Sequence, residues 1–432
     1  MPSAKPLVVL AHAVNTLAAV DWAMRVGANG VEMDLRFGAA QDPLQISSRD
    51  VVGPNDVLEF RHSQYKNKDG RLTYDNDCDC SYASNTCQGD RGAKENNVCQ
   101  NYGQGPESCT PLALAPNTAV YNWAELYKCH PCIKRAPAAA MMEKLASYQD
   151  RLAVVYLDSK IDIDDKPTNL SLAGQNVVAF TDTNLFGNGY RGQVVVSCPS
   201  KQQLEYLRGV QQALENSAFR GNYYLTIDGQ SSIFDLSPAN CLFTGVQAES
   251  NYFYDVANAL RPLTKNRIYS TGITTYIPCI FKNQMALAGY NVKSGSLSSA
   301  GIWTLDSPTS MAEYLYLNSG SIMTNCPATA LDVVRSKKDR GYLATPGSAF
   351  QPAQNDNTVQ VSYEEPCWSN GNCVNNACGR FTFDSSAPLQ CCPRGETYFT
   401  NYNPFQPGLL RDFCTGTLSY GELAVVHMYF LL

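Results

Sequence analysis

Short apolar runs alternate with amphipathic stretches along most of the chain, and many of the runs end in a polar residue. Apolar runs of this length predict buried strands, and the amphipathic stretches between them predict helices. The runs lie at residues 8–10, 31–35, 58–61, 152–157, 193–196, 223–227, 267–270, 301–305 and 321–324. About eight strands that alternate with helices predict an α/β fold with a parallel sheet, and a closed (β/α)8 TIM barrel fits best.

The first strand, helix and strand show the repeating unit clearly. The apolar stripe of the helix consists of Leu17, Val20 and Met24, at helical spacing. We expect Asn15 or Thr16 to cap this helix at its start, because short polar side chains accept hydrogen bonds from free backbone amides there. Gly27 ends the helix before the second strand.

Polar residues follow the predicted strands at their carboxyl ends, which form the rim where TIM barrels carry out chemistry. They are His12, Glu32, Asp34, His62, Asp158, Asp228, Asp306 and Asn325. Glu32 and Asp34 lie two residues apart in one strand, so both side chains point to the same face. Such carboxylates repel each other unless a cation lies between them, and a nearby histidine then suits phosphoester chemistry. The alternative is a satisfied histidine beside two solvated acids, and we expect Asp228 and Asp306 to be structural.

The seventeen cysteines are concentrated in two polar segments. Seven lie between Cys78 and Cys132, in an insertion of about residues 63–137, and six lie between Cys367 and Cys414. We therefore expect a barrel domain over residues 1–355, a cysteine-rich extension over residues 356–432, and disulfides in both polar segments. The first strand follows Met1 almost directly. The clustered cysteines nevertheless favour an oxidising compartment, so we expect a secreted, extracellular protein whose signal peptide is absent from this chain.

Composition and charge exclude several classes of protein. Hydrophobic residues make up 44% of the chain and charged residues 17%, which is typical of a globular protein. A net charge of −6 argues against nucleic-acid binding, because little would neutralise a run of phosphates. The sequence has no apolar run of about eighteen residues, so no transmembrane segment is predicted. We expect a monomer.

Five short motifs lie in order between residue 6 and about residue 355. They are Ala11-His12, Ala28-Asn29-Gly30-Val31-Glu32-Met33-Asp34, Tyr156-Leu157-Asp158-Ser159-Lys160, Ile302-Trp303-Thr304-Leu305-Asp306 and Ile322-Met323-Thr324-Asn325. Together they resemble the sphingomyelinase D family of spider venoms, the dermonecrotic phospholipase D group of the glycerophosphodiester phosphodiesterase-like barrels. Residues 341–345 with Phe350-Gln351-Pro352 also resemble the short tail that plugs the bottom of those barrels.

The resemblance implies a metal site and two catalytic histidines. By position, Glu32, Asp34 and Asp158 would bind one Mg²⁺ ion, while His12 and His62 would flank the phosphorus. His62 matches the nucleophile that forms a phosphohistidine in that family, and His12 matches the general acid and base.

The resemblance also implies a substrate. Lys160 would neutralise phosphate oxygens, Asn325 would hydrogen-bond the substrate, and Trp303 would offer its ring to a quaternary ammonium such as choline. The implied activity is that of a phospholipase D-type phosphodiesterase at a membrane surface. Such an enzyme cleaves the headgroup from choline or ethanolamine sphingo- or lysophospholipids, often leaving a cyclic phosphate.

Other interpretations stay open at this point. His62 is followed by Ser63 and Gln64, whereas that family has a glycine and a close cysteine pair there, and His130 between Cys129 and Cys132 is another candidate. The barrel could instead hydrolyse soluble glycerophosphodiesters. It could also be catalytically inactive and serve as a secreted binding module.

Overall fold

A computed structural model gives the architecture of the chain. The structure describes residues 5–15, 17–38, 57–60, 64–66, 72–74, 79–81, 86–88, 137–161, 167, 169–228, 245–272, 279–305, 308–324, 326–338, 340–359, 378–379, 390–391, 396–399 and 413–416. The first strand, most of the alternating strands and helices, and the segment after the last helix all lie within these ranges.

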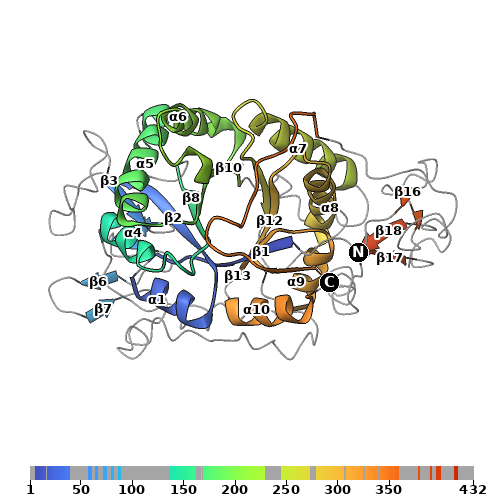
Figure 1. Cartoon of the computed structure of the whole chain (residues 1–432), viewed down its shortest axis with the longest axis horizontal. Helices are drawn as coiled ribbons and strands as arrows, with labels where there is room; N and C mark the ends of the chain where they lie inside the picture. The colour runs from blue at the N-terminus through green and yellow to red at the C-terminus, as the bar shows by residue number, and fades with distance from the viewer. Residues whose placement is uncertain are drawn as a thin grey trace.

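Eight parallel strands form the barrel (Figure 1). They are β1 (Lys5–Ala11), β2 (Gly30–Gly38), β8 (Val154–Ser159), β9 (Gln193–Cys198), β10 (Tyr223–Ile227), β11 (Ile268–Gly272), β12 (Ser299–Trp303) and β13 (Ser321–Thr324). Their order in the sheet is β10-β9-β8-β2-β1-β13-β12-β11. A parallel bridge between Leu225 and Arg267 joins β10 to β11, so the two ends of this order meet. The TIM barrel predicted from the alternating pattern is therefore confirmed.

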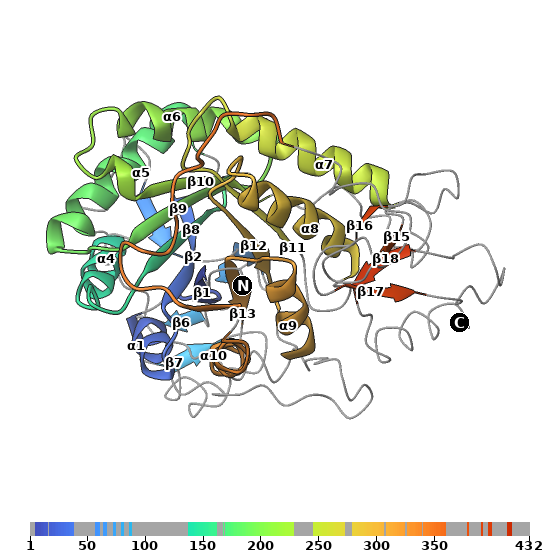
Figure 2. The ribbon, with the colours of Figure 1, turned by 45° about the vertical axis from the view of Figure 1, so that its right-hand side comes forward.

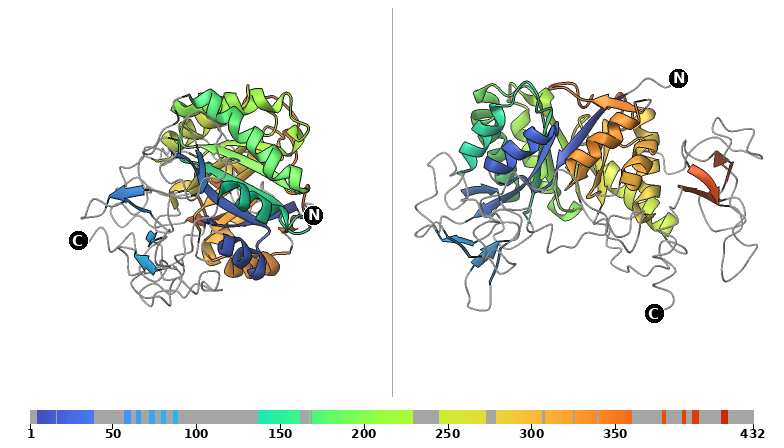
Figure 3. Two further views of the ribbon diagram at one scale, coloured as in Figure 1. Left: turned by 90° about the vertical axis from the view of Figure 1, so that its left-hand side faces the viewer. Right: turned by 90° about the horizontal axis from the view of Figure 1, so that it is seen from below.

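Helices cover the outside of the strands, as Figure 2 and the two views in Figure 3 show. They are α1 (Leu17–Val26), α4 (Ala138–Ala146), α5 (Leu170–Asn184), α6 (Leu204–Leu214), α7 (Gly245–Leu260), α8 (Cys279–Lys293), α9 (Pro308–Tyr316) and α10 (Pro327–Ser336). Three short 3₁₀ turns accompany them at Phe186–Asn188, Lys201–Gln203 and Arg220–Asn222. Each α-helix follows a strand or precedes the next one, as a parallel barrel requires.

Alternate side chains of each strand pack into two different apolar layers. The barrel interior contains Val8, Leu10, Val154, Tyr156, Val195 and Tyr224. The layer between strands and helices contains Val9, Val31, Val155, Val194 and Leu225. This period of two also decides which strand-end polar side chains face the mouth of the barrel.

Strand β3 (Val57–Phe60) is not a barrel strand, although its apolar run was counted with them in the sequence. It pairs antiparallel with the outer end of β2, from Leu35 opposite Phe60 to Gly38 opposite Val57. The last pairing of β1 with β2 is Ala11 with Val31, so the edge of β2 beyond that point needs another partner. Because β3 runs antiparallel to β2 and ends with Phe60 opposite Leu35, it leads the chain back toward the rim of the barrel.

The segment after α10 closes the amino-terminal end of the barrel. Strand β14 (Gly341–Leu343) pairs with the first residues of β1. Phe350 lies in the interior layer, and its backbone N–H donates to Gln193 Oε1 (2.8 Å) while its carbonyl accepts from the Tyr224 hydroxyl (3.0 Å). Gln193 begins β9, so the plug lies at the opposite end from the strand-end acids.

In the insertion and the extension, the structure describes residues 137 and 356–359 and several short strands. These are β4 (Gln64–Lys66), β5 (Leu72–Tyr74), β6 (Asp79–Ser81), β7 (Thr86–Gln88), β15 (Cys378–Gly379), β16 (Gln390–Cys391), β17 (Glu396–Phe399) and β18 (Phe413–Gly416). Cys198 is a buried cysteine, and Cys326 is disulfide-bonded. Five cysteines of the two predicted clusters lie in these short strands, namely Cys80, Cys87, Cys378, Cys391 and Cys414, and the others lie outside the described residues. The disulfides expected in both clusters stay predictions. Among the described helices, none has both the length and the apolar character needed to cross a membrane.

Candidate functional site

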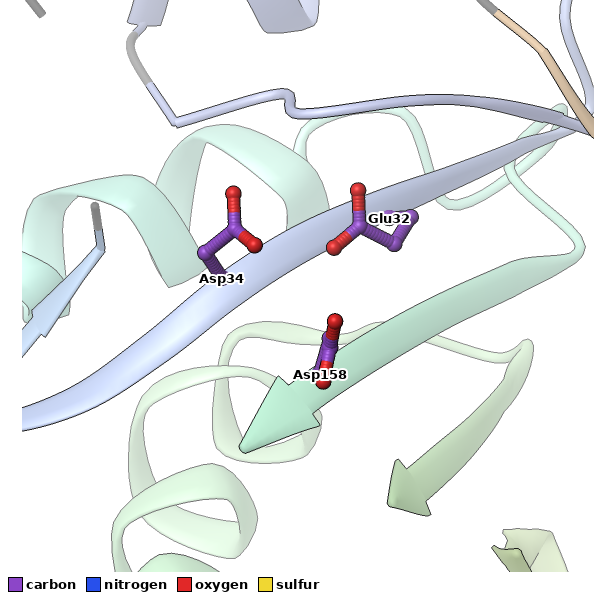
Figure 4. A group of neighbouring side chains, drawn as sticks. All are labelled: Glu32, Asp34 and Asp158. Atoms are coloured by element: carbon purple, nitrogen blue, oxygen red, sulfur yellow. The ribbon is translucent and has the colours of Figure 1, made fainter. Parts of the chain in front are cut away.

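Two neighbouring strands bring three carboxylates together at the mouth of the barrel (Figure 4). Glu32 and Asp34 project from β2, and Asp158 projects from β8, where it is the direct register partner of Asp34. One oxygen from each carboxylate lies within 4.8 Å of the others. Glu32 and Asp34 are fully buried. Three negative groups at this separation form a site that suits a hard cation.

The loop that follows β1 holds the two carboxylates of β2. The backbone N–H of Ala13 donates to Glu32 Oε2 (2.6 Å), and the N–H of Val14 donates to the Glu32 carbonyl (2.8 Å). The Asn15 amide donates to Asp34 Oδ2 (2.7 Å), while its Oδ1 accepts from the Asp34 backbone N–H (3.0 Å). The loop at residues 12–15 thus hydrogen-bonds the part of β2 that lies between its pairing with β1 and its pairing with β3.

Lys160 supplies positive charge to the cluster. Its Nζ lies 3.2 Å from Asp34 Oδ1 and forms a short ion pair with Asp158 Oδ2. Burial alone would lower the pKa of the Lys160 amine, but the carboxylates of Asp158 and Asp34 outweigh burial and raise it well above its usual value. Lys160 is therefore a permanent cation here.

One lysine does not balance three carboxylates. Burial, and then the charges of Asp34 and Asp158, raise the pKa of Glu32 well above its usual value. Glu32 Oε1 is also buried and accepts no hydrogen bond from the residues that the structure describes. A second positive group at this position would remove both penalties, so the donor set fits a divalent cation held by carboxylate oxygens.

His12 lies beside the cluster rather than within it. Its Nε2 is 3.9 Å from Glu32 Oε2, and its side chain is 26% exposed. The backbone N–H of His12 donates to the Thr324 carbonyl (3.0 Å), which ties the residue to the end of β13. An imidazole that is close to the acids yet open to solvent can exchange a proton with a bound molecule.

A second buried network lies next to the acids. The hydroxyls of Tyr156 and Ser270 donate to the two oxygens of Asp228 (2.9 and 2.7 Å). Burial, and then the charge of Asp158, raise the pKa of Asp228 to about 6. Both oxygens of Asp228 have protein donors, as expected for the structural role predicted from the sequence.

The other predicted site residues are placed less completely. Trp303 ends β12 and packs against the interior layer from the carboxyl side of the barrel. His62, Asn325, Asp306 and His130 lie outside the described residues. Strand β13 ends at Thr324, one residue before Asn325, and β3 ends two residues before His62.

Two residues near the acids were not predicted to have a role in the site. Asn15 was one of two residues expected to cap α1, and its side-chain amide bonds Asp34, because the unpaired edge of β2 lies beside it. Thr16, the other cap candidate, lies outside the described residues. Ser197 of β9 donates to Asp158 Oδ1 (3.2 Å). The strand-end position of Ser197 is visible in the sequence, whereas its partner depends on the pairing of β9 with β8.

Comparisons with known proteins give similarity of fold only. No protein-family model and no curated protein matches the chain. A glycerophosphodiester phosphodiesterase of Parabacteroides distasonis is 12% identical, with a TM-score of 0.41 over 78% of this chain and 100% of that one. One from Agrobacterium tumefaciens is 12% identical, with a TM-score of 0.39 over 76% and 99%. A phosphodiesterase of Oleispira antarctica, in complex with sn-glycerol-3-phosphate, is 12% identical, with a TM-score of 0.37 over 77% and 97%. Similarity this low does not transfer an activity to the chain.

Proposed function

We propose that this chain is a metal-dependent phosphodiesterase with its site at the carboxyl ends of the barrel strands. The observation that carries the proposal is the meeting of Glu32, Asp34 and Asp158 within 4.8 Å, at the end of the barrel where such folds carry out chemistry. A partly buried lysine and a partly exposed histidine flank these acids. This combination can bind a phosphate and move a proton.

The three carboxylates would hold one divalent ion, and we propose Mg²⁺ because hard oxygen ligands suit it. When bound, it would neutralise charge on the substrate phosphate and polarise the phosphoryl group. Lys160 would contribute a second positive charge toward a phosphate oxygen, since its ammonium already faces the same space between Asp34 and Asp158.

Two histidines would divide the proton transfer and the nucleophilic attack. We propose that His62 attacks phosphorus while the leaving alcohol takes a proton from His12. His12 then accepts a proton from the lipid hydroxyl or water that displaces His62. The described end of β3 supports His62 in this role, because Phe60 lies opposite Leu35, the residue next to Asp34.

We propose choline or ethanolamine diesters as substrates, with phospholipids at a membrane surface as their source. The partly buried ring of Trp303 at the mouth supports this class, because an aromatic face attracts a quaternary ammonium. Asn325 would hydrogen-bond the same substrate, and it directly follows β13. The dense cysteines of the polar segments support secretion.

The test is an assay of purified full-length protein against sphingomyelin, lysophosphatidylcholine and glycerophosphocholine, with Mg²⁺ or with a chelator. Headgroup release and phosphorus NMR of the product are followed. We expect Mg²⁺-dependent release that Glu32→Gln and His12→Asn reduce by orders of magnitude. Cleavage of glycerophosphocholine alone would support a soluble-diester phosphodiesterase. No cleavage of any diester with any divalent ion would refute the proposal and favour a binding module.

A further inference from the structure

We propose that Asn15 is a positioning residue that makes Asp34 present a single oxygen to the ion, and so favours Mg²⁺ over Ca²⁺. The inference rests on the proposed metal centre and concerns how the chain builds it. Asn15 touches neither the substrate space nor the ion directly, because its amide and carbonyl both face Asp34.

The contact between Asn15 and Asp34 is reciprocal and buried. Asn15 donates to Asp34 Oδ2 at 2.7 Å and accepts from the Asp34 backbone N–H at 3.0 Å. The two residues are 3% and 0% exposed. A buried fork of this kind fixes both the position and the rotation of the carboxyl group. Oδ1 is then the oxygen that faces Lys160, 3.2 Å away.

The same loop also holds Glu32, through a backbone N–H. The Ala13 N–H donates a hydrogen bond to Glu32 Oε2, whereas Glu32 Oε1 is buried and receives no hydrogen bond from a described residue. Ala13 has a φ of +55°, a left-handed conformation that is uncommon for a residue with a Cβ. The loop therefore maintains an unfavourable backbone conformation at the residue that binds one of the two acids.

The loop hydrogen-bonds one oxygen of each acid of β2, and this arrangement is selective. Mg²⁺ requires near-octahedral geometry with short bonds and binds each carboxylate through one oxygen, whereas Ca²⁺ accepts six to eight oxygens and readily takes both from one carboxylate. With Oδ2 occupied by Asn15, Asp34 offers only one oxygen. Removal of the Asn15 amide would let Asp34 rotate and bind through both oxygens.

The experiment compares Asn15→Ala with Asn29→Ala by calorimetric titration of the chelator-treated protein with Mg²⁺ and Ca²⁺. Asn29 is a matched control, since it is also a buried asparagine between β1 and β2. It bonds the Val9 N–H (2.8 Å) and the carbonyls of Leu7 and Ala344 (both 3.0 Å), at the other end of the barrel. Circular dichroism reports folding and the start of α1 in each variant.

We expect Asn15→Ala to weaken Mg²⁺ binding by roughly 10–100-fold and Ca²⁺ binding by less, so that the Mg²⁺/Ca²⁺ affinity ratio falls. Asn29→Ala should lower the melting temperature but leave that ratio unchanged. If Asn15→Ala does not fold, the near-isosteric Asn15→Asp should lower the ratio in the same way, because it replaces the donor with an oxygen.

The outcomes separate this inference from the proposed function. A wild-type chain that binds no divalent ion overturns both. A wild-type chain that binds Mg²⁺, with an unchanged ratio in Asn15→Ala or Asn15→Asp, overturns the role of Asn15 alone. An equal fall in Asn29→Ala also overturns it, since the effect would then come from general loosening of the barrel.

Discussion

Removal of Lys160 tests whether the carboxylate cluster is under electrostatic stress without a metal. In Lys160→Met the long side chain is kept, but Asp34 and Asp158 lose the ammonium that pairs with both. Loss of one partner from a buried ion pair costs about 3–5 kcal/mol, because it leaves uncompensated buried charge. For a domain of this size, about 2 °C per kcal/mol gives a fall in melting temperature of roughly 6–10 °C.

The size of this effect should depend on pH. The pKa of Glu32 is raised in the folded protein, so the stability that its proton provides is present at low pH and is lost as the pH rises through that folded pKa. Lys160 lowers the pKa of Glu32, so its removal raises that pKa further and enlarges the penalty at high pH. Protonation relieves the repulsion at low pH, where the variant should lose less stability.

Thermal melts in chelator at about pH 5.5 and about pH 8 measure the fall in melting temperature and its dependence on pH. Lys201→Met is the matched control, because Lys201 pairs with Asp255 at 2.7 Å but both side chains are about half exposed. An exposed pair of this kind contributes about 0–1 kcal/mol, so the control should melt within about 2 °C of the wild type. A Lys160→Met protein that melts like the control at about pH 8, or with no dependence on pH, would refute the electrostatic account of the site.

Three further variants test the site and the plug. Glu32→Gln should raise the melting temperature of the metal-free protein, because it removes one of three crowded charges, while calorimetry shows at least tenfold weaker Mg²⁺ binding; a lower melting temperature would contradict this. Phe350→Ala should cost about 3–5 kcal/mol in chemical unfolding, because the ring fills the interior layer. Its kcat per folded molecule should be unchanged, since the plug lies at the far end from the acids. Trp303→Ala should raise KM for choline diesters by roughly 2–30-fold, from a cation–π contribution of about 0.5–2 kcal/mol. An equal rise for glycerophosphoglycerol, which lacks a cation, would argue against recognition of the headgroup by the ring.

The linear sequence determined the barrel and much of its rim. Strand periodicity placed Glu32 and Asp34 on one face, because side chains two residues apart in a strand always share a side. Strand ends were also predictable, since an apolar run that stops at an acid cannot continue into the core. These inferences succeeded because they depend on local chain geometry.

The direction of each strand and the residues that it pairs with were decided only by the tertiary structure. The run at residues 58–61 had the composition of a barrel strand, yet the strand observed there, β3, lies antiparallel on β2, because periodicity contains no information about the direction of a neighbouring strand. Asn15 was considered, with Thr16, only as a helix cap, whereas the short pairing of β1 leaves an edge of β2 beside Asn15 that its side chain bonds. The register of β2 with β8 places Asp158 opposite Asp34 and turns two acids into a cluster of three. A shift of one residue would have directed the Asp158 side chain to the opposite face, and no feature of either strand alone prevents that shift.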